Sequence, residues 1–162
     1  MKDLLADLVK RVAALEAAKV KNEATTITPF NRAYFSAYAS GTTSLSGANT
    51  KVALAGTTSN DGHFSTVNSN YTCPVAGRYL FTGCVGMTTS GSGPIIVTLF
   101  SNNAEIARGY QDNLAGATYH QIVVCAILLC AANDVIDMRA WATAGGSTQA
   151  GSAYTYLMGQ IQ

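Results

Sequence analysis

The sequence predicts an all-β sandwich preceded by a short helix. Nine of the first 23 residues are ionisable, whereas the remaining 139 carry only ten Lys, Arg, Asp or Glu. Beyond residue 32, short apolar runs alternate with Gly, Ser, Thr, Asn and Pro turn signals, which is typical of an all-β domain. The chain is long enough for one domain and an appendage. We therefore expect a helix over residues 1–23, a linker over 24–32 and a β head over 33–162.

The N-terminal helix is predicted by heptad spacing. Its stem positions a and d are Leu5, Leu8, Val12 and Leu15. About two heptads are too few for an isolated coil in water, so the helix needs a partner. Three helices in a homotrimer stem, or docking on another protein, fit the wide stripe. The alternative is one helix lying on its own head.

The head contains nine predicted strands. They cover Ala33–Ala39, Lys51–Ala55, Asn70–Thr72, Gly77–Met87, Ile95–Asn102, Glu105–Tyr110, Thr118–Leu129, Val135–Thr143 and Ala153–Ile161. Three loops rich in small and polar residues separate some of them: Ser40–Thr50, Thr88–Pro94 and Ala144–Ser152. The aromatic side chains of Tyr71, Tyr79 and Phe81 are expected to share one inward face of the sandwich.

The run from Ile122 to Leu129 is apolar at every position. A sandwich strand normally buries one face and exposes the other, so this strand needs a second cover. We expect a neighbouring subunit to supply it, with Ile122 and Val124 in the head interface. Cover by a loop of the same chain is the alternative. The low charge of the head favours an interface, because interface cores are depleted in charge.

Composition excludes several functions. The net charge of +1 predicts no nucleic-acid footprint, and no apolar run is long enough to cross a bilayer. The first residues do not resemble a secretory signal peptide. The four cysteines lack metal-type spacing, and we expect reduced, mostly buried thiols in a protein made in the cytosol.

Candidate catalytic chemistry is sparse. His63 and His120 are the only histidines, and neither has cysteines or carboxylates at a metal-ligand spacing. We therefore expect no catalytic residue, no metal and no cofactor. Trp141 is the single tryptophan and shares a strand phase with Asp137 and Arg139, so it is a candidate ligand contact. Packing of Trp141 under a loop or subunit is the alternative.

Several motifs in the head resemble one family. The strongest is Tyr71-Thr72-Cys73-Pro74-Val75-Ala76-Gly77-Arg78-Tyr79-Leu80-Phe81, and the others are Ala33–Ala37, Asp61–Phe64, Leu99–Asn103, Leu128–Val135 and Tyr154–Ile161. Together they resemble the globular head of the C1q and tumour-necrosis-factor-like superfamily. The resemblance implies a jelly-roll sandwich, a homotrimer and a non-catalytic binding role. The implied trimer makes Tyr154 and Tyr156, near the closing strand, candidates for its interface. Packing in the core of their own chain is the alternative for each.

The sequence departs from this family at two places. Asn133 stands where the family usually has Gly, which is acceptable because Asn tolerates a left-handed backbone. The collagen stalk of many animal members is missing, and the short coil takes its place. Heads of this kind also occur on bacteriophage fibres and capsid decorations, which the layout resembles more.

The function expected from these observations is that of a trimeric structural protein of a virion, assembled in the host cytoplasm. The N-terminal helix would attach to a capsid or tail protein, and the three loops would contact a host-surface glycan or receptor. The first alternative is a secreted C1q-like ligand or adhesion module of a cell. The second is an enzyme on a jelly roll, such as a cupin, which would need clustered His and carboxylates that are absent from this sequence.

Overall fold

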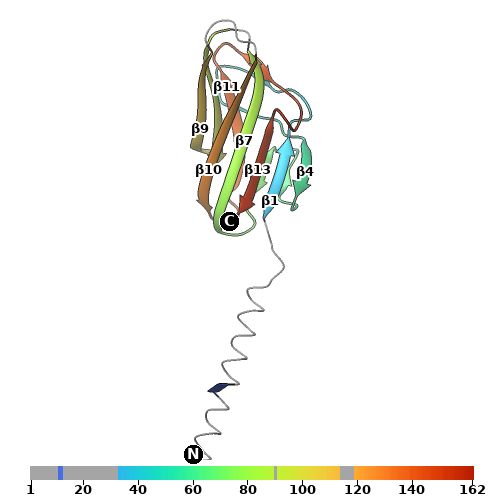
Figure 1. Ribbon diagram of the computed structural model, residues 1–162, viewed down its shortest axis with the longest axis vertical. Coiled ribbons are helices and arrows are strands. Elements are labelled where there is room, and N and C mark those ends of the chain that lie inside the picture. Colours follow the sequence, from blue (N-terminus) through green and yellow to red (C-terminus); the bar gives the residue numbers. More distant parts are fainter. Residues whose placement is uncertain (1–10, 13–32, 90, 114–118) are drawn as a thin grey trace, which may run out of the picture. The chain divides into compact units, whose positions relative to one another are not determined.

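The computed structural model describes residues 11–12, 33–89, 91–113 and 119–162. Two compact units divide the chain, residues 1–31 and 32–162. Arg11 and Val12 are helical, and the rest of the predicted helix lies outside the described residues. The second unit is the predicted β head, and its strands run lengthwise along the sandwich in Figure 1.

The described residues of the head form thirteen strands. They are β1 Tyr34–Tyr38, β2 Ser44–Leu45, β3 Thr50–Lys51, β4 Gly56–Asn60, β5 Phe64–Ser65, β6 Asn70–Thr72, β7 Gly77–Thr89, β8 Gly93–Ser101, β9 Ala104–Asn113, β10 Tyr119–Cys130, β11 Val135–Ala142, β12 Gly146–Thr148 and β13 Tyr156–Ile161. All strand pairs are antiparallel.

The strands form two sheets. In the first sheet β10 pairs with one edge of β7, while β13 and β12 pair with its other edge; β1 and β4 follow beyond β13, and β2 follows beyond β12. The second sheet has the order β5-β6-β11-β8-β9, with β3 paired to β11. Because neighbours in a sheet are mostly distant in sequence, the two sheets form a jelly-roll-like sandwich rather than a meander.

An aromatic cluster fills one end of the core. Phe35 stacks on Tyr71 with ring centroids 4.3 Å apart, and Tyr79 stacks on Phe81 at 5.7 Å. Tyr71, Tyr79 and Phe81 are fully buried, which confirms that they share the inward face. Each buried ring contributes roughly 1.5–3 kcal/mol. The cluster joins the two sheets, since Tyr71 belongs to the second sheet and the other three rings to the first.

The turns follow the expected chemistry. Asn102 and Asn103 connect β8 to β9, and both have positive φ, 49° and 66°, as a two-residue hairpin of the right twist requires. Asn133, with φ 72°, adopts the left-handed conformation that we expected of it in place of Gly.

Several predicted boundaries were wrong. Most of the predicted strand Lys51–Ala55 is not a strand, although Val52 and Leu54 are buried in the core. The Leu54 amide donates to the Ser69 hydroxyl rather than to the backbone of a neighbouring strand. β4 was missed because Gly56–Asn60 is a polar edge strand, without apolar alternation. β2 and β12 lie within stretches expected to be loops.

Candidate functional site

The outward surface of the first sheet is apolar and nearly uncharged. Arg78 is the one Lys, Arg, Asp or Glu in β1, β7, β10 and β13. Side chains on β10 alternate between core and solvent, and the outward ones remain exposed: Val123 55%, Ile127 64% and Leu129 87%. We call this surface the apolar face, and define it by Tyr34, Leu80, Tyr119, Val123, Ile127, Leu129, Tyr154, Tyr156 and Met158.

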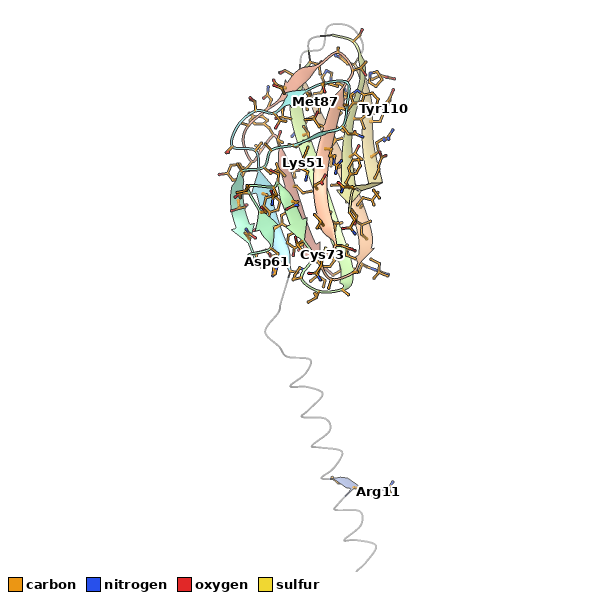
Figure 2. The ribbon with its side chains drawn as sticks, turned by 180° about the vertical axis from the view of Figure 1, so that it is seen from behind. Arg11, Lys51, Asp61, Cys73, Met87 and Tyr110 are labelled. Carbon is orange, nitrogen blue, oxygen red and sulfur yellow. The ribbon has the colours of Figure 1, made fainter. Side chains whose placement is uncertain are left out.

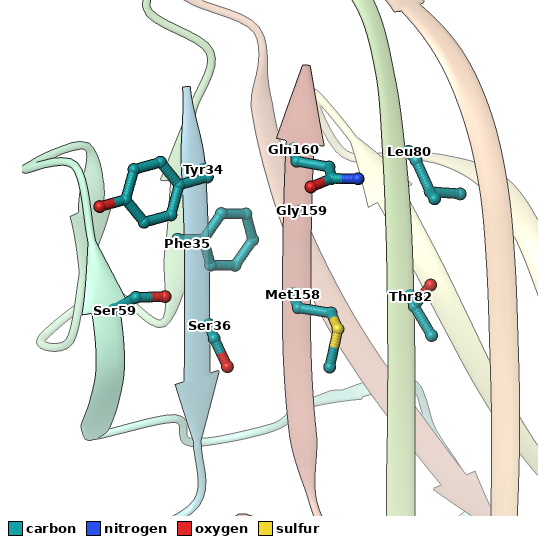
Figure 3. Close-up of a pocket in the computed structure, with 9 residues that line it drawn as sticks. All are labelled: Tyr34, Phe35, Ser36, Ser59, Leu80, Thr82, Met158, Gly159 and Gln160. Atoms are coloured by element: carbon teal, nitrogen blue, oxygen red, sulfur yellow. The ribbon is translucent and has the colours of Figure 1, made fainter. Parts of the chain in front are cut away.

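A hollow of about 260 Å³ lies on the apolar face. Figure 3 shows the nine lining residues, which come from four adjacent strands: Tyr34, Phe35, Ser36, Ser59, Leu80, Thr82, Met158, Gly159 and Gln160. No side chain of the lining carries a charge. The hollow is therefore suited to an apolar or weakly polar side chain rather than to an ionic ligand.

Two aromatic rings extend the apolar face toward the far end of β7. Tyr119 and Tyr154 meet edge to face, with centroids 6.4 Å apart and planes at 87°. Both reach Gly86 of β7: a Cβ there would lie 3.1 Å from the Tyr154 Cβ and 3.3 Å from the Tyr119 hydroxyl. The pair is half exposed, Tyr119 43% and Tyr154 46%, so it offers aromatic area of the kind enriched in interfaces.

Two cysteines on this side of the sheet differ in burial. Cys84 is fully buried, and burial raises the pKa of its thiol despite hydrogen bonds from Gln121 and Tyr156 that act in the opposite direction. Cys125 is exposed, and its sulfur accepts the Thr82 hydroxyl at 3.6 Å. Neither thiol has a described base beside it that would activate it as a nucleophile.

The outward surface of the second sheet is different, because charged groups gather there. Asp137 is almost fully buried and accepts two hydrogen bonds from Arg139, at 2.7 and 3.1 Å. It also forms an ion pair with Lys51 at 3.1 Å. The Arg139 guanidinium also lies 4.0 Å over the ring of Phe100. Asp137 raises the pKa of Arg139. These groups pair with one another, so the cluster stabilises the sheet.

The three loops expected to be distal meet at one end of the sandwich. β12, from the third loop, pairs with both β2, from the first, and the end of β7 that begins the second. The Thr148 amide donates to the Thr43 carbonyl at 2.9 Å, and the Thr43 amide to the Thr148 hydroxyl at 2.8 Å. The Thr143 amide reaches the Pro94 carbonyl at 3.1 Å. We call this group of three loops the apical loops. Figure 1 shows this end of β7 opposite the C-terminus.

No family model matches the sequence, and no curated protein does. Solved structures match the fold. The globular domain of zebrafish complement 1qA superposes with a TM-score of 0.63 at 15% identity, over 81% of this chain and 97% of that domain. Eiger TNF from S. frugiperda gives 0.64 at 14% identity, covering 81% and 92%, and murine APRIL gives 0.67 at 11%, covering 82% and 100%.

The head has the C1q/TNF-like fold. This confirms the family resemblance at the level of structure, and with it the jelly-roll sandwich. At identities of 11–15%, these matches show the fold alone. A fold does not determine what a domain binds.

In the C1q/TNF-like head, the two β10 residues predicted to lie in the trimer interface face the core instead. Ile122 and Val124 are only 5% and 4% exposed, and both pack in the core of their own chain. They therefore do not need a cover from a neighbour. The exposed apolar side chains are the alternate residues of the same strand, Val123, Ile127 and Leu129. A strand that is apolar on both faces is expected to have one face against its own core and the other against a second cover. The sequence alone does not tell which residues lie on which face.

The other predicted site residues have these places in the C1q/TNF-like head. Tyr154 and Tyr156 lie on the apolar face, exposed and half-buried respectively. Trp141 is half-buried on the second sheet, and a Cβ on Gly47 would lie 3.8 Å from its indole nitrogen. The first apical loop thus packs beside Trp141. Val12 is 46% exposed in its helical segment, while Leu5, Leu8 and Leu15 lie outside the described residues.

No group of three or more His, Cys, Asp or Glu among the described residues is arranged to hold a metal ion. No helix in the described part is long and apolar enough to span a membrane. The features missed from the sequence are the hollow and the Tyr119–Tyr154 pair. Both depend on cross-strand register, which no local pattern reveals.

Proposed function

We propose that this chain is a self-associating, non-catalytic binding head whose apolar face packs against copies of itself in a homotrimer. The observation that carries the proposal is the apolar face. A row of side chains exposed by 55–87% on a sheet with one charged residue is unusual for a monomer surface. The zebrafish complement, Eiger and APRIL domains share the fold, and the family resemblance implies three subunits.

The apolar face has an exposed row on one side and a hollow on the other. The β10 row, Val123, Ile127 and Leu129, projects from one side, and the hollow beside Leu80 and Met158 lies on the other. Contact between unlike patches gives a closed ring when the rotation between neighbours is one third of a turn. In the proposed trimer, the β10 row of one subunit packs toward the hollow of the next.

Light scattering of the full chain at micromolar concentration tests this arrangement. We expect the mass of three chains, and Ile127→Asp should shift it to one chain, because three charges would be buried without partners. Val67→Asp is the control, since Val67 is 92% exposed in the turn between β5 and β6. A monomeric parent chain, or a trimer unaffected by Ile127→Asp, would refute the proposal.

We propose further that the trimer is a structural component of a virus particle. The heptad spacing of Leu5, Leu8, Val12 and Leu15 supports a short trimeric stem that attaches to a capsid or tail protein. The apical loops support host contact, because they form one connected surface at the end opposite the C-terminus. A host-surface glycan or receptor is the proposed ligand, with Trp141 beside these loops.

Purified particles test the location. The chain should co-purify with virions from the source culture through a density gradient, in multiples of three copies. Deletion of residues 1–23 should leave a folded head that no longer associates with particles. Recovery of the chain only from the particle-free secreted fraction would favour the alternative, a cellular C1q-like ligand. That alternative is supported by the fold of the complement and TNF domains.

A further inference from the structure

Two buried cysteines meet at the end of the head that holds the C-terminus. Cys73 follows β6 of the second sheet, and Cys130 is the last residue of β10 in the first sheet. They are 0% and 3% exposed and belong to the same core cluster, and each thiol is near enough to the other to affect its pKa. Figure 2 labels Cys73 at this lower end of the head. The pair therefore lies between the two sheets, with one cysteine from each side.

The backbone around the pair holds both residues in place. The Cys73 amide donates to the Asp134 carbonyl at 2.8 Å, and the Asn133 amide donates to the Cys73 carbonyl at 2.7 Å. The Asp134 carboxylate accepts the Ala131 amide at 2.7 Å. The turn after Cys130 is thus fixed to Cys73 on both sides. These bonds hold Cys73 beside the turn that follows Cys130, and a disulfide requires two cysteines that lie close together in this way.

We propose that Cys73 and Cys130 are a disulfide site that links the two sheets when the chain is exposed to a low-molecular-weight disulfide oxidant. One thiolate attacks the oxidant's disulfide, forming a mixed disulfide and releasing one small thiol. The second protein thiolate attacks the protein sulfur of that mixed disulfide and releases the second small thiol. The protein loses two hydrogens and two electrons, and the oxidant is reduced to two thiols.

Burial sets the kinetics of this step. Burial raises the pKa of both thiols. The neighbouring Cys130 raises the pKa of Cys73 further, whereas Cys73 lowers that of Cys130 without cancelling the effect of burial. Thiolate is therefore scarce in the folded head. The bond should therefore form during folding or opening of this end, and slowly in the native protein. The other two cysteines are on the opposite surface of the first sheet: Cys84 is covered, and Cys125 is exposed on a different strand. This arrangement selects one pair among the four.

Oxidative refolding tests the site. The full chain is refolded in a mixture of oxidised and reduced glutathione, quenched with N-ethylmaleimide and mapped by mass spectrometry. We expect two alkylated cysteines, a mass loss of two hydrogens, and a linked peptide pair containing Cys73 and Cys130. The double variant Cys84→Ser/Cys125→Ser should form the same linkage, and its Tm should be roughly 5–15 °C higher oxidised than reduced.

The outcomes separate cleanly. Four alkylated cysteines under conditions that oxidise an unfolded control peptide, or a different linked pair, would overturn the assignment. A Cys73→Ser variant that retains the two-hydrogen loss would do so as well. If that variant does not fold, the peptide map of the double variant still decides. The proposed trimer is measured separately, by the mass of the reduced chain.

Discussion

Gly109 on β9 lies so close to Val123 on β10 that a Cβ on the glycine would be 2.7 Å from the Val123 carbonyl oxygen. The two strands belong to different sheets and share no ladder. Their close approach closes one side of the sandwich, next to the exposed β10 row. The absence of a side chain at position 109 is therefore required by the backbone of the facing sheet.

Gly109→Ala should consequently destabilise the head. The added methyl group would overlap with backbone, which cannot rotate away, and overpacking of this kind costs about 1–3 kcal/mol. Urea denaturation followed by tyrosine fluorescence measures the loss as a lower midpoint. Gly41→Ala is the matched control, because a Cβ there would have nothing within 4 Å. Equal midpoints for the two variants would show that the strand contact is loose.

Asp137 should be the most important charge in the head. Asp137→Ala leaves the Arg139 guanidinium without the two hydrogen bonds at 2.7 and 3.1 Å and Lys51 without its partner. We expect a loss of about 2–3 kcal/mol in the free energy of unfolding, as for hydrogen bonds between charged groups. Glu105→Ala is the control: it also removes a two-bond pair, with Arg108, but at an exposed site. A larger effect of Glu105→Ala would contradict this ranking.

The buried tyrosines predict a loss of stability in alkali. Burial, with the neighbouring Cys73 thiol, raises the pKa of Tyr79 to about 12, from 10 in the unfolded chain. Burial and the hydrogen bond to Asp61 also raise the pKa of Tyr71. Between these pH values the unfolded chain loses protons that the folded head retains, so stability falls as the pH rises above 10.

Tyr79→Phe isolates this contribution. At pH 7 the variant loses the hydrogen bond to the Val75 carbonyl, 2.9 Å, and should be less stable by about 1 kcal/mol. Between pH 10 and 12 its stability should fall less steeply than that of the parent chain, because one titrating group is gone. Urea midpoints measured at several pH values give both slopes. Parallel slopes would contradict a raised pKa for Tyr79.

Local patterns in the sequence predicted the parts of the fold that local physics determines. Alternating aromatic residues placed Tyr71, Tyr79 and Phe81 inside. The left-handed backbone of Asn133 was expected from the family resemblance, because Asn stands there in place of Gly. The polar strand Gly56–Asn60 was missed because it is held by pairing with β1, which is distant in sequence. Strands β2 and β12 were missed for the same reason. Each is only two or three residues long and is held by pairing with a distant part of the chain.

The candidate site shows the same division. Because Ile122–Leu129 is apolar on both faces, the sequence correctly indicated that one face of this strand is uncovered in the single chain. Which residues lie on that face depends on how β10 pairs with β7, where Val123 lies opposite Cys84. The hollow requires four strands from three distant segments of the chain. The apical loops, expected as three separate loops, become one surface through the β2–β12–β7 pairing, which no short-range signal encodes.

That pairing gives a last prediction, at Gly146. The glycine has φ 154°, and a Cβ there would overlap with the Thr88 carbonyl oxygen across the ladder. Gly146→Ala should therefore separate β12 from β7 and release the first apical loop, while the core remains packed. Hydrogen exchange should become faster by at least tenfold at the Thr148 amide, which bonds to the Thr43 carbonyl, and remain unchanged at Phe81. Gly41→Ala again serves as the control. Unchanged protection of Thr148 would mean that side-chain bonds such as that from the Thr43 amide to the Thr148 hydroxyl hold the loops together without the strand. If the apical loops bind a glycan, Gly146→Ala should also lose that binding on a glycan array while its mass in light scattering equals that of the parent chain.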